Sequence, residues 1–424
     1  MSVTEAPKPA APAAAPAGQT IDLKRERETI QQRLGRLSPT SDAYASEFVD
    51  SLLKFAHLVR TSDVHLQPTR TGLDVKFRHD GVLQGLGTFP LGANSSVISR
   101  LKVLSKLLTY QSDMPQEGRI QKPEWGREIR VSTYPTLYGE RGVLRFFGHD
   151  KEFTTLGELG NSPAITRHIC DALLETSGAV LITGPAGSGK STTLYACLRH
   201  IVTHSQGSRA VVTIEDPIEV PIEGVAQSQV NVAGGFDLAC GLRSLMRQDP
   251  EVIMVGEIRD RDTADFAIQA SLTGQLLLAT FHADNAASAI TRLIEMEIEP
   301  FLVRSGLIAV INQRLLRVLC SCARESTDPN DFCGLEIERA RLPVGCDRCN
   351  HTGYAHRAII SEFLDLRSAS IGSAILQRAD SREIYRLAIG SGMSPLADEA
   401  TAMARAGKTS PSEVRRVLGS GTRT

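Results

Sequence analysis

Hydrophobic and polar positions in the first part of the chain follow two different periods. Apolar residues recur at three- and four-residue spacing over residues 44–61, which predicts a helix with one buried face. Apolar and charged residues then alternate over 73–78, which predicts a half-buried strand, and Asp80-Gly81 is a hairpin turn signal before a return strand. A small α+β domain is therefore expected over residues 44–150. Its further predicted elements are a helix at 98–108 and strands near 129–131 and 143–146.

Short apolar runs alternate with helical stretches in the second part of the chain, a pattern typical of a parallel sheet. The runs are 179–182, 210–214, 252–255 and 276–279 with Phe281. Each is followed directly by groups suited to phosphate chemistry: a glycine loop, then Glu215, Glu257 and His282 in that order. Because the carboxyl ends of parallel strands share one edge, where ligands bind, we predict that these groups converge on one pocket.

The glycine loop is Gly184-Pro-Ala-Gly-Ser-Gly-Lys-Ser191, between a predicted strand and a predicted helix. Its glycines let the backbone curl so that N–H groups face a triphosphate, and the helix adds its positive N-terminal end. Lys190 would reach the β- and γ-phosphates, and the Ser191 hydroxyl would bind Mg²⁺. We therefore predict binding of a nucleoside triphosphate. The expected contact residues are Gly184, Pro185, Ala186, Gly187, Ser188, Gly189, Lys190, Ser191 and Thr192.

The charged groups that follow the other strands suit phosphoryl transfer to water. Glu257 sits where a carboxylate can hold Mg²⁺ or its water shell, and it can also orient the attacking water. Glu215 is a second candidate for activating that water, and the spacing leaves both glutamates as candidates. His282 is placed to sense the γ-phosphate.

Composition adds bounds on the class of protein. A chain of 424 residues predicts two or three domains at ~150 residues each. Its 47 basic and 48 acidic residues nearly balance, so we expect no direct nucleic-acid partner. Residues 1–43 read as a disordered Ala/Pro-rich tail and a short charged helix, and they are unlike a signal peptide. No apolar run approaches the ~20 residues of a membrane span, so we expect a cytosolic protein.

Paired cysteines mark a polar, loop-rich insertion at 320–353. The first pair is C-x-C and the second is C-x-x-C, and together they fit a tetrahedral structural zinc site. Cys333 is an alternative to Cys322 as the fourth ligand, and reduced, metal-free thiols are the alternative to zinc. The expected ligands are Cys320, Cys322, Cys346 and Cys349.

These segments resemble the type II/type IV secretion ATPases, the GspE/PilB group that drives pseudopilus and pilus assembly. Thr183–Tyr195 resembles the phosphate loop of that family, Thr213–Glu219 its aspartate box, Asp249–Asp260 its atypical Walker B and Thr273–His282 its histidine box. Upstream, Thr61–Pro68, Phe77–Leu83, Pro115–Arg119 and Arg130–Thr136 are similar to the domain that precedes the motor. The resemblance covers roughly residues 44–419.

The resemblance implies an α/β fold: a RecA-like P-loop ATPase domain with a parallel-rich sheet over 162–424. A PAS-like α+β domain would precede it, with a linker at 151–161. The cysteine insertion and a helical end at 366–419 would belong to the ATPase domain. The resemblance also implies zinc in the insertion, because the assembly ATPases carry such a site there and the retraction ATPases lack it.

The resemblance further implies a ring hexamer that hydrolyses ATP with Mg²⁺. Nucleotide would sit between the two domains, with Arg130 and Arg145 delivered from the mobile N-terminal domain or from a neighbour; Arg141 lies nearby in the sequence. Force would pass to an inner-membrane platform protein, with a cytoplasmic anchor as a further partner. The protein would thus be cytoplasmic and peripherally associated with the inner membrane.

Other functions are compatible with the same motifs. One alternative is a competence, DNA-transport or other secretion motor of the same superfamily. A second is a nucleotide-gated scaffold with little hydrolysis, against which the presence of both glutamates, the histidine and the arginines weighs. Only residues 1–43 precede the region of resemblance, whereas assembly ATPases usually carry a further N-terminal domain that docks on a membrane-anchored partner.

Overall fold

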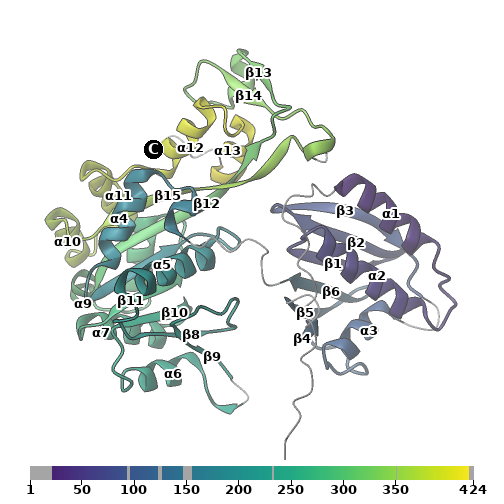
Figure 1. Ribbon diagram of the computed structural model, residues 1–424, viewed down its shortest axis with the longest axis horizontal. Helices are drawn as coiled ribbons and strands as arrows, with labels where there is room; N and C mark the ends of the chain where they lie inside the picture. The colour runs from purple at the N-terminus through teal and green to yellow at the C-terminus, as the bar shows by residue number, and fades with distance from the viewer. Residues whose placement is uncertain are drawn as a thin grey trace, which may run out of the picture. The chain divides into compact units, whose positions relative to one another are not determined.

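The computed structural model describes residues 22–92, 96–122, 127–146, 155–231, 234–349 and 351–419. The chain divides into two compact units, Met1–Asp150 and Lys151–Thr424 (Figure 1). The predicted disordered tail, 1–20, lies outside the described residues. Among the residues described, no helix combines the length and apolarity that crossing a bilayer requires.

The first unit is a six-stranded antiparallel sheet in the order β3-β2-β1-β6-β5-β4. Its strands are β1 (Asp63–Thr69), β2 (Gly72–His79), β3 (Val82–Phe89), β4 (Gln116–Lys122), β5 (Arg127–Thr136) and β6 (Gly139–Phe146). Its helices are α1 (Leu23–Gly35), α2 (Tyr44–Leu58) and α3 (Val97–Leu104).

One face of this sheet is packed under the helices. On β5, Ile129 and Val131 are fully buried, whereas Arg130 between them projects from the opposite face, as the two-residue period of a strand requires. The predicted hairpin is confirmed: Asp80 and Gly81 both have positive φ, the conformation of a tight hairpin turn. The helix predicted at 98–108 is shorter, because Lys106 adopts a left-handed φ of 59° just beyond its end.

The second unit contains a seven-stranded sheet in the order β15-β12-β7-β11-β10-β8-β9. All neighbouring strands are parallel except the pair β12 and β15. The parallel sheet predicted from the apolar runs is therefore confirmed. The strands are β7 (Gly178–Thr183), β8 (Val211–Glu215), β9 (Ala226–Gln229), β10 (Val252–Ile258), β11 (Leu276–Phe281), β12 (Leu307–Leu319) and β15 (Tyr354–Asp365).

Helices cover both faces of this sheet. Alternate residues of β7 enter opposite cores: Ala179 and Leu181 pack on one side, Val180 and Ile182 on the other. The first core is covered by α6 (Leu238–Leu245), α7 (Arg261–Leu272), α8 (Ala286–Glu295), α9 (Pro300–Gly306), α10 (Ala369–Leu376) and α11 (Ser381–Gly390). The second is covered by α4 (Pro163–Leu173), α5 (Lys190–Ser205) and the 3₁₀ turn η2 (Leu156–Leu159).

The segment predicted as a linker at 151–161 lies partly outside the described residues. In its described remainder, both leucines of η2 are buried against α5, so this half packs as part of the second unit. The predicted cysteine insertion leaves the sheet between β12 and β15. It contains β13 (Arg324–Ser326), η4 (Pro329–Phe332), β14 (Ala340–Leu342) and η5 (Asp347–Cys349). Next to it, α12 (Leu396–Arg405) and α13 (Pro411–Leu418) pack on the outer ends of β12 and β15.

Candidate functional site

The carboxyl ends of four adjacent parallel strands form the candidate site in the second unit. Strands β7, β11, β10 and β8 lie side by side in that order. The phosphate loop leaves β7, Glu215 ends β8, Glu257 lies at the end of β10, and His282 follows β11. Because the strands are parallel, the structure brings all of these groups to one edge.

The phosphate loop has a backbone that only glycine adopts readily. Gly184, Gly187 and Gly189 all have positive φ, and a Cβ on Gly184 would lie 2.5 Å from the Gln313 carbonyl oxygen. At the start of α5, the Lys190 ammonium donates to the carbonyl oxygens of Gly184 (2.9 Å) and of the following proline (3.0 Å). Burial lowers the pKa of Lys190, and the negative charge of Glu257 opposes that shift. The loop thus lies at a helix N-terminus with the ammonium group of its lysine beside the backbone, and a helix N-terminus of this kind is a usual binding site for phosphate.

Glu257 is held between two basic side chains. Its Oε1 lies 2.7 Å from His282 Nε2, and Arg259 Nε donates to its Oε2 at 2.6 Å. The Glu257 side chain keeps 20% of its surface accessible. This carboxylate is therefore oriented on both sides and still reachable from solvent, as a group that positions a water must be.

Glu215 has a different environment. It is 2% exposed, and its Oε1 accepts hydrogen bonds from Thr213 Oγ1 (2.6 Å) and Gln227 Nε2 (3.0 Å). Its Oε2 accepts a hydrogen bond from the Tyr195 hydroxyl, whose pKa is raised by burial and by this carboxylate. Both glutamates therefore have a partner on each oxygen, and they differ in exposure: Glu215 is buried among its donors, whereas Glu257 stays accessible to a water.

Sequence reasoning missed Glu219 as a site residue, although it closes the segment resembling the aspartate box. The Ser191 hydroxyl donates to Glu219 Oε1 at 3.3 Å, and the Glu219 backbone N–H donates to the Tyr195 hydroxyl at 3.0 Å. A hydroxyl and a carboxylate oxygen thus lie together at the start of α5. Hard oxygen donors of this kind are the ligands that Mg²⁺ prefers.

A second missed group comes from the strand on the other side of β7. Asn312 pairs in register with Thr183, so Gln313 and Arg314 lie beside the phosphate loop. Gln313 is fully buried and donates from Nε2 to the Ser188 carbonyl at 2.8 Å. The available signal was an uninterrupted polar triplet, Asn-Gln-Arg, in a strand that is otherwise apolar except for Arg317, and such a triplet is unfavourable unless its groups have specific partners.

Arg130 and Arg145 lie in the first unit, directly opposite each other on β5 and β6. Both belong to the face not covered by helices. Arg145 Nε donates to Asp63 Oδ1 at 2.9 Å, and Arg130 is ion-paired with Glu117. Arg141 instead contacts the His65 ring at 3.2 Å. The strand registers extend the first two arginines into a cross-strand row: Arg119, Arg130, Arg145, Asp63 and Arg78.

The cysteines of the insertion form a candidate metal centre. The sulfur atoms of the four predicted ligands all lie within 4.8 Å of one another. Cys320 and Cys346 are 3.8 Å apart, as are Cys322 and Cys349. Cys333 is outside this cluster, with its thiol directed at the Asp331 carbonyl. Four thiols converging in this way suit one tetrahedral ion, with Cys322 and not Cys333 as the fourth ligand.

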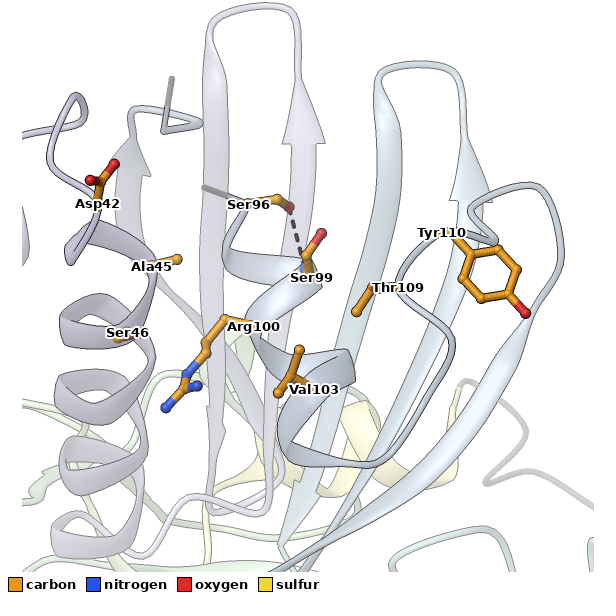
Figure 2. Close-up of a pocket in the computed structure, with 9 residues that line it drawn as sticks. All are labelled: Asp42, Ala45, Ser46, Ser96, Ser99, Arg100, Val103, Thr109 and Tyr110. Carbon is orange, nitrogen blue, oxygen red and sulfur yellow. Dashed lines mark hydrogen bonds between the residues drawn. The ribbon is translucent and has the colours of Figure 1, made fainter. Parts of the chain in front are cut away.

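A cavity of about 520 Å³ lies in the first unit, between the N-terminal part of α2, α3 and the loop that follows α3 (Figure 2). Its lining is made mainly of small hydroxyl and apolar side chains, and the predicted site residues are not among them. The lining residues are Asp42, Ala45, Ser46, Ser96, Ser99, Arg100, Val103, Thr109 and Tyr110.

Comparison with known proteins finds relatives that cover most of this chain. The chain is 40% identical over 379 residues to a type II secretion system protein E of Aeromonas hydrophila, covering 87% of this chain and 75% of that protein. It is 38% identical over 384 residues to the type IV pilus assembly ATPase PilB of Thermus thermophilus, covering 88% of this chain and 43% of that protein. The fold resembles the crystal structure of the Legionella pneumophila ATPase DotB, with a TM-score of 0.62, 22% identity, and coverage of 87% and 94% of the two chains. The family described as "Type II/IV secretion system protein" matches residues 39–416, and the chain belongs to that family.

Proposed function

We propose that this protein hydrolyses ATP at the strand edge of the second unit and thereby powers assembly of a type IV pilus or a type II secretion pseudopilus. The observation that carries the proposal is the convergence of Lys190, Glu257 and His282 on that edge. The relatives named as a type II secretion protein and a pilus assembly ATPase support the choice of process.

Each group has a role that follows from its surroundings. Lys190 and the loop amides neutralise the phosphates, and Glu257, oriented by His282, positions the attacking water and accepts its proton. His282 is placed to respond to the γ-phosphate through its contact with Glu257. Glu215 holds the segment after β8 in place.

The residues at the start of α5 fit a magnesium ion. Ser191 and Glu219 supply a hydroxyl and a carboxylate oxygen next to the phosphate loop, and these would hold Mg²⁺ directly or through its water shell. When bound, Mg²⁺ would neutralise charge on the β- and γ-phosphates.

We further propose that the protein works as a homohexamer in which Arg130 and Arg145 complete the nucleotide site. The two guanidinium groups lie opposite each other on neighbouring strands, each paired with a carboxylate that a phosphate would replace, and guanidinium suits the charge that develops in phosphoryl transfer. Arg145 is more than half exposed, so exchanging its partner Asp63 for a phosphate needs little local rearrangement. A head-to-tail interface that closes into a ring sets one surface of each subunit against a different surface of the next, as delivery of an arginine to a neighbour's site requires.

The insertion is proposed to hold one zinc ion as a structural element. The four thiolates converge as a tetrahedral site requires. The partners proposed for this motor are an inner-membrane platform protein and a cytoplasmic anchor, which would hold it peripherally at the inner membrane.

Phosphate release by the purified full chain tests the proposal. Wild-type protein with Mg²⁺ and ATP should release phosphate, and Lys190→Ala should lower that rate by at least ~10²-fold, because it removes the charge that stabilises the phosphates. If wild-type protein binds ATP but releases phosphate no faster than Lys190→Ala, the protein is a nucleotide-gated scaffold and the proposal is wrong.

A further inference from the structure

Arg314 is a cation at the phosphate loop to which neither the motifs nor the resemblance assigned a role. It lies on β12, two residues beyond Asn312, which pairs in register with the last residue of β7. A Cβ placed on Gly184 would be 3.3 Å from Arg314 Nη1, which measures how close the guanidinium is to the loop backbone. Lys190 donates to the carbonyl oxygen of the same glycine. The two cations therefore meet at Gly184.

The guanidinium is fixed in place by uncharged oxygens. Nη2 donates to the Asp284 carbonyl at 2.7 Å, and Nη1 donates to the Gln313 carbonyl and to Asn312 Oδ1, both at 3.3 Å. Asp284 lies two residues beyond His282, so Arg314 is tied to the loop that carries the histidine. These contacts orient the guanidinium without a direct ion pair among them.

Asn312 is itself held by a buried network. Its Oδ1 also accepts a hydrogen bond from Thr183 Oγ1 at 3.2 Å, and its Nδ2 donates to Glu362 Oε1 at 3.1 Å. Glu362 is fully buried and also accepts hydrogen bonds from the Ala286 backbone N–H at 2.8 Å and the Tyr385 hydroxyl at 3.0 Å. Such a satisfied network fixes the amide, and the amide fixes the arginine.

Arg314 and Lys190 are close enough for their charges to affect each other. Burial lowers the pKa of Arg314, and the Asp284 and Glu362 carboxylates partly oppose that shift. Arg314 also lowers the pKa of Lys190, because the two positive charges repel each other. A phosphate between two partly desolvated cations removes this repulsion, and charge-assisted hydrogen bonds from guanidinium to phosphate are strong.

We propose that Arg314 binds the γ-phosphate of ATP together with Lys190, as a sensor supplied by the same unit that carries the phosphate loop. The γ-phosphate is the group expected here, because Lys190 reaches the β- and γ-phosphates and the Asp284 contact places Arg314 on the side of His282. This inference rests on the proposed function, and it adds to it a cation that distinguishes ATP from ADP.

The test compares nucleotide binding by Arg314→Gln, Arg314→Lys and wild-type full-length protein. A non-hydrolysable ATP analogue and ADP, each with Mg²⁺, compete against a fluorescent nucleotide. Arg314→Gln should weaken binding of the ATP analogue by ~10- to ~100-fold and binding of ADP by much less, because one charge-assisted contact to the γ-phosphate is lost. Arg314→Lys should recover part of the loss. Arg386→Gln is the matched control, since Arg386 is a surface arginine paired with Glu383 on α11, and it should bind as wild type.

The ratio of the two dissociation constants separates a phosphate contact from a structural one. Measured on one preparation, this ratio does not depend on the folded fraction. If Arg314→Gln weakens both nucleotides equally, or neither, the inference is overturned. Lys190→Ala distinguishes that result from failure of the proposed function: it should lose both nucleotides, and wild-type binding by Lys190→Ala would overturn the nucleotide site itself.

Discussion

Glu257, near the end of β10, and His282, directly after the adjacent parallel strand β11, contact each other through their side chains: His282 Nε2 lies 2.7 Å from Glu257 Oε1. The second carboxylate oxygen of Glu257 accepts from Arg259. A carboxylate held in this way has a fixed orientation toward the edge where the phosphate loop lies. The contact between His282 and Glu257 therefore depends on how β10 and β11 pair in the sheet.

Glu257→Gln should bind ATP with nearly wild-type affinity and release phosphate at least ~10²-fold more slowly, because the shape remains while the proton acceptor is lost. The measurement is phosphate release at saturating ATP, with binding followed separately. Glu215→Gln is the matched comparison. Thr213 and Gln227 donate to one oxygen of Glu215 and Tyr195 donates to the other, so the NH₂ group of an amide at 215 must face a donor on either side, and we expect lower thermal stability. Wild-type turnover by Glu257→Gln would reassign the water-activating role.

Arg145→Ala should lower turnover while largely sparing ATP binding, since an arginine that acts on developing charge contributes less in the ground state. In the proposed ring, specific activity should rise with protein concentration and level off as hexamers form, which sedimentation can follow in parallel. Mixing Arg145→Ala with Lys190→Ala should restore part of the activity, because each variant supplies the half-site that the other lacks. Concentration-independent activity with no recovery on mixing would instead indicate a self-contained monomer.

Protein purified without chelator should contain about one zinc ion per chain, measurable by elemental analysis. Cys349→Ser should lose the metal, because Cys349 lies in the sulfur cluster. Cys333→Ser should retain it, since that thiol lies outside the cluster, and it is therefore the matched control. ATP binding should survive metal loss, because the ligands are separate from the strand edge that holds Lys190. Zinc loss on Cys333→Ser with retention on Cys349→Ser would reverse the ligand assignment.

Glu413 should make stability depend on pH. It is fully buried on α13 and bonded to Arg317 and Arg416. Burial alone would raise its pKa, but hydrogen bonds from Arg416 and Arg317 outweigh burial and lower it. Its stabilisation is therefore complete above the ordinary glutamate pKa of ~4.3 and is lost as the pH falls through the lowered native value.

Glu413→Gln should accordingly reduce the free energy of unfolding by ~3 kcal/mol at neutral pH, because two arginines lose their buried partner. Urea unfolding at pH 7 and at acid pH tests this, and the gap between wild type and variant should shrink on acidification. Glu383→Gln removes an exposed ion pair on α11 and should leave stability unchanged. A gap that stays constant with pH would show that Glu413 does not titrate with unfolding.

Local chemistry accounts for the elements that could be predicted from sequence. The period-two alternation over 73–78 and the Asp80-Gly81 turn specify a hairpin, because each depends only on neighbouring residues. The phosphate loop can be predicted from sequence for the same reason, because its glycines, lysine and serine are all close neighbours along the chain. Short apolar runs followed by polar groups then predict a parallel sheet with a functional edge.

The tertiary structure decided what depends on residues far apart in sequence. Strand order placed Glu257 against His282, and folding brought the side chains of Tyr195 on α5 and Gln227 on β9 to Glu215, so that the two glutamates differ in their surroundings. The register of β12 on β7 brought Arg314 to Gly184 across more than a hundred residues of chain. The path of the insertion likewise places Cys322, and not Cys333, with the other three cysteines of the candidate metal centre. Hydrogen bonds and coordination act over about 3 Å in space, so their partners are set by how strands and loops pack and not by their separation along the chain.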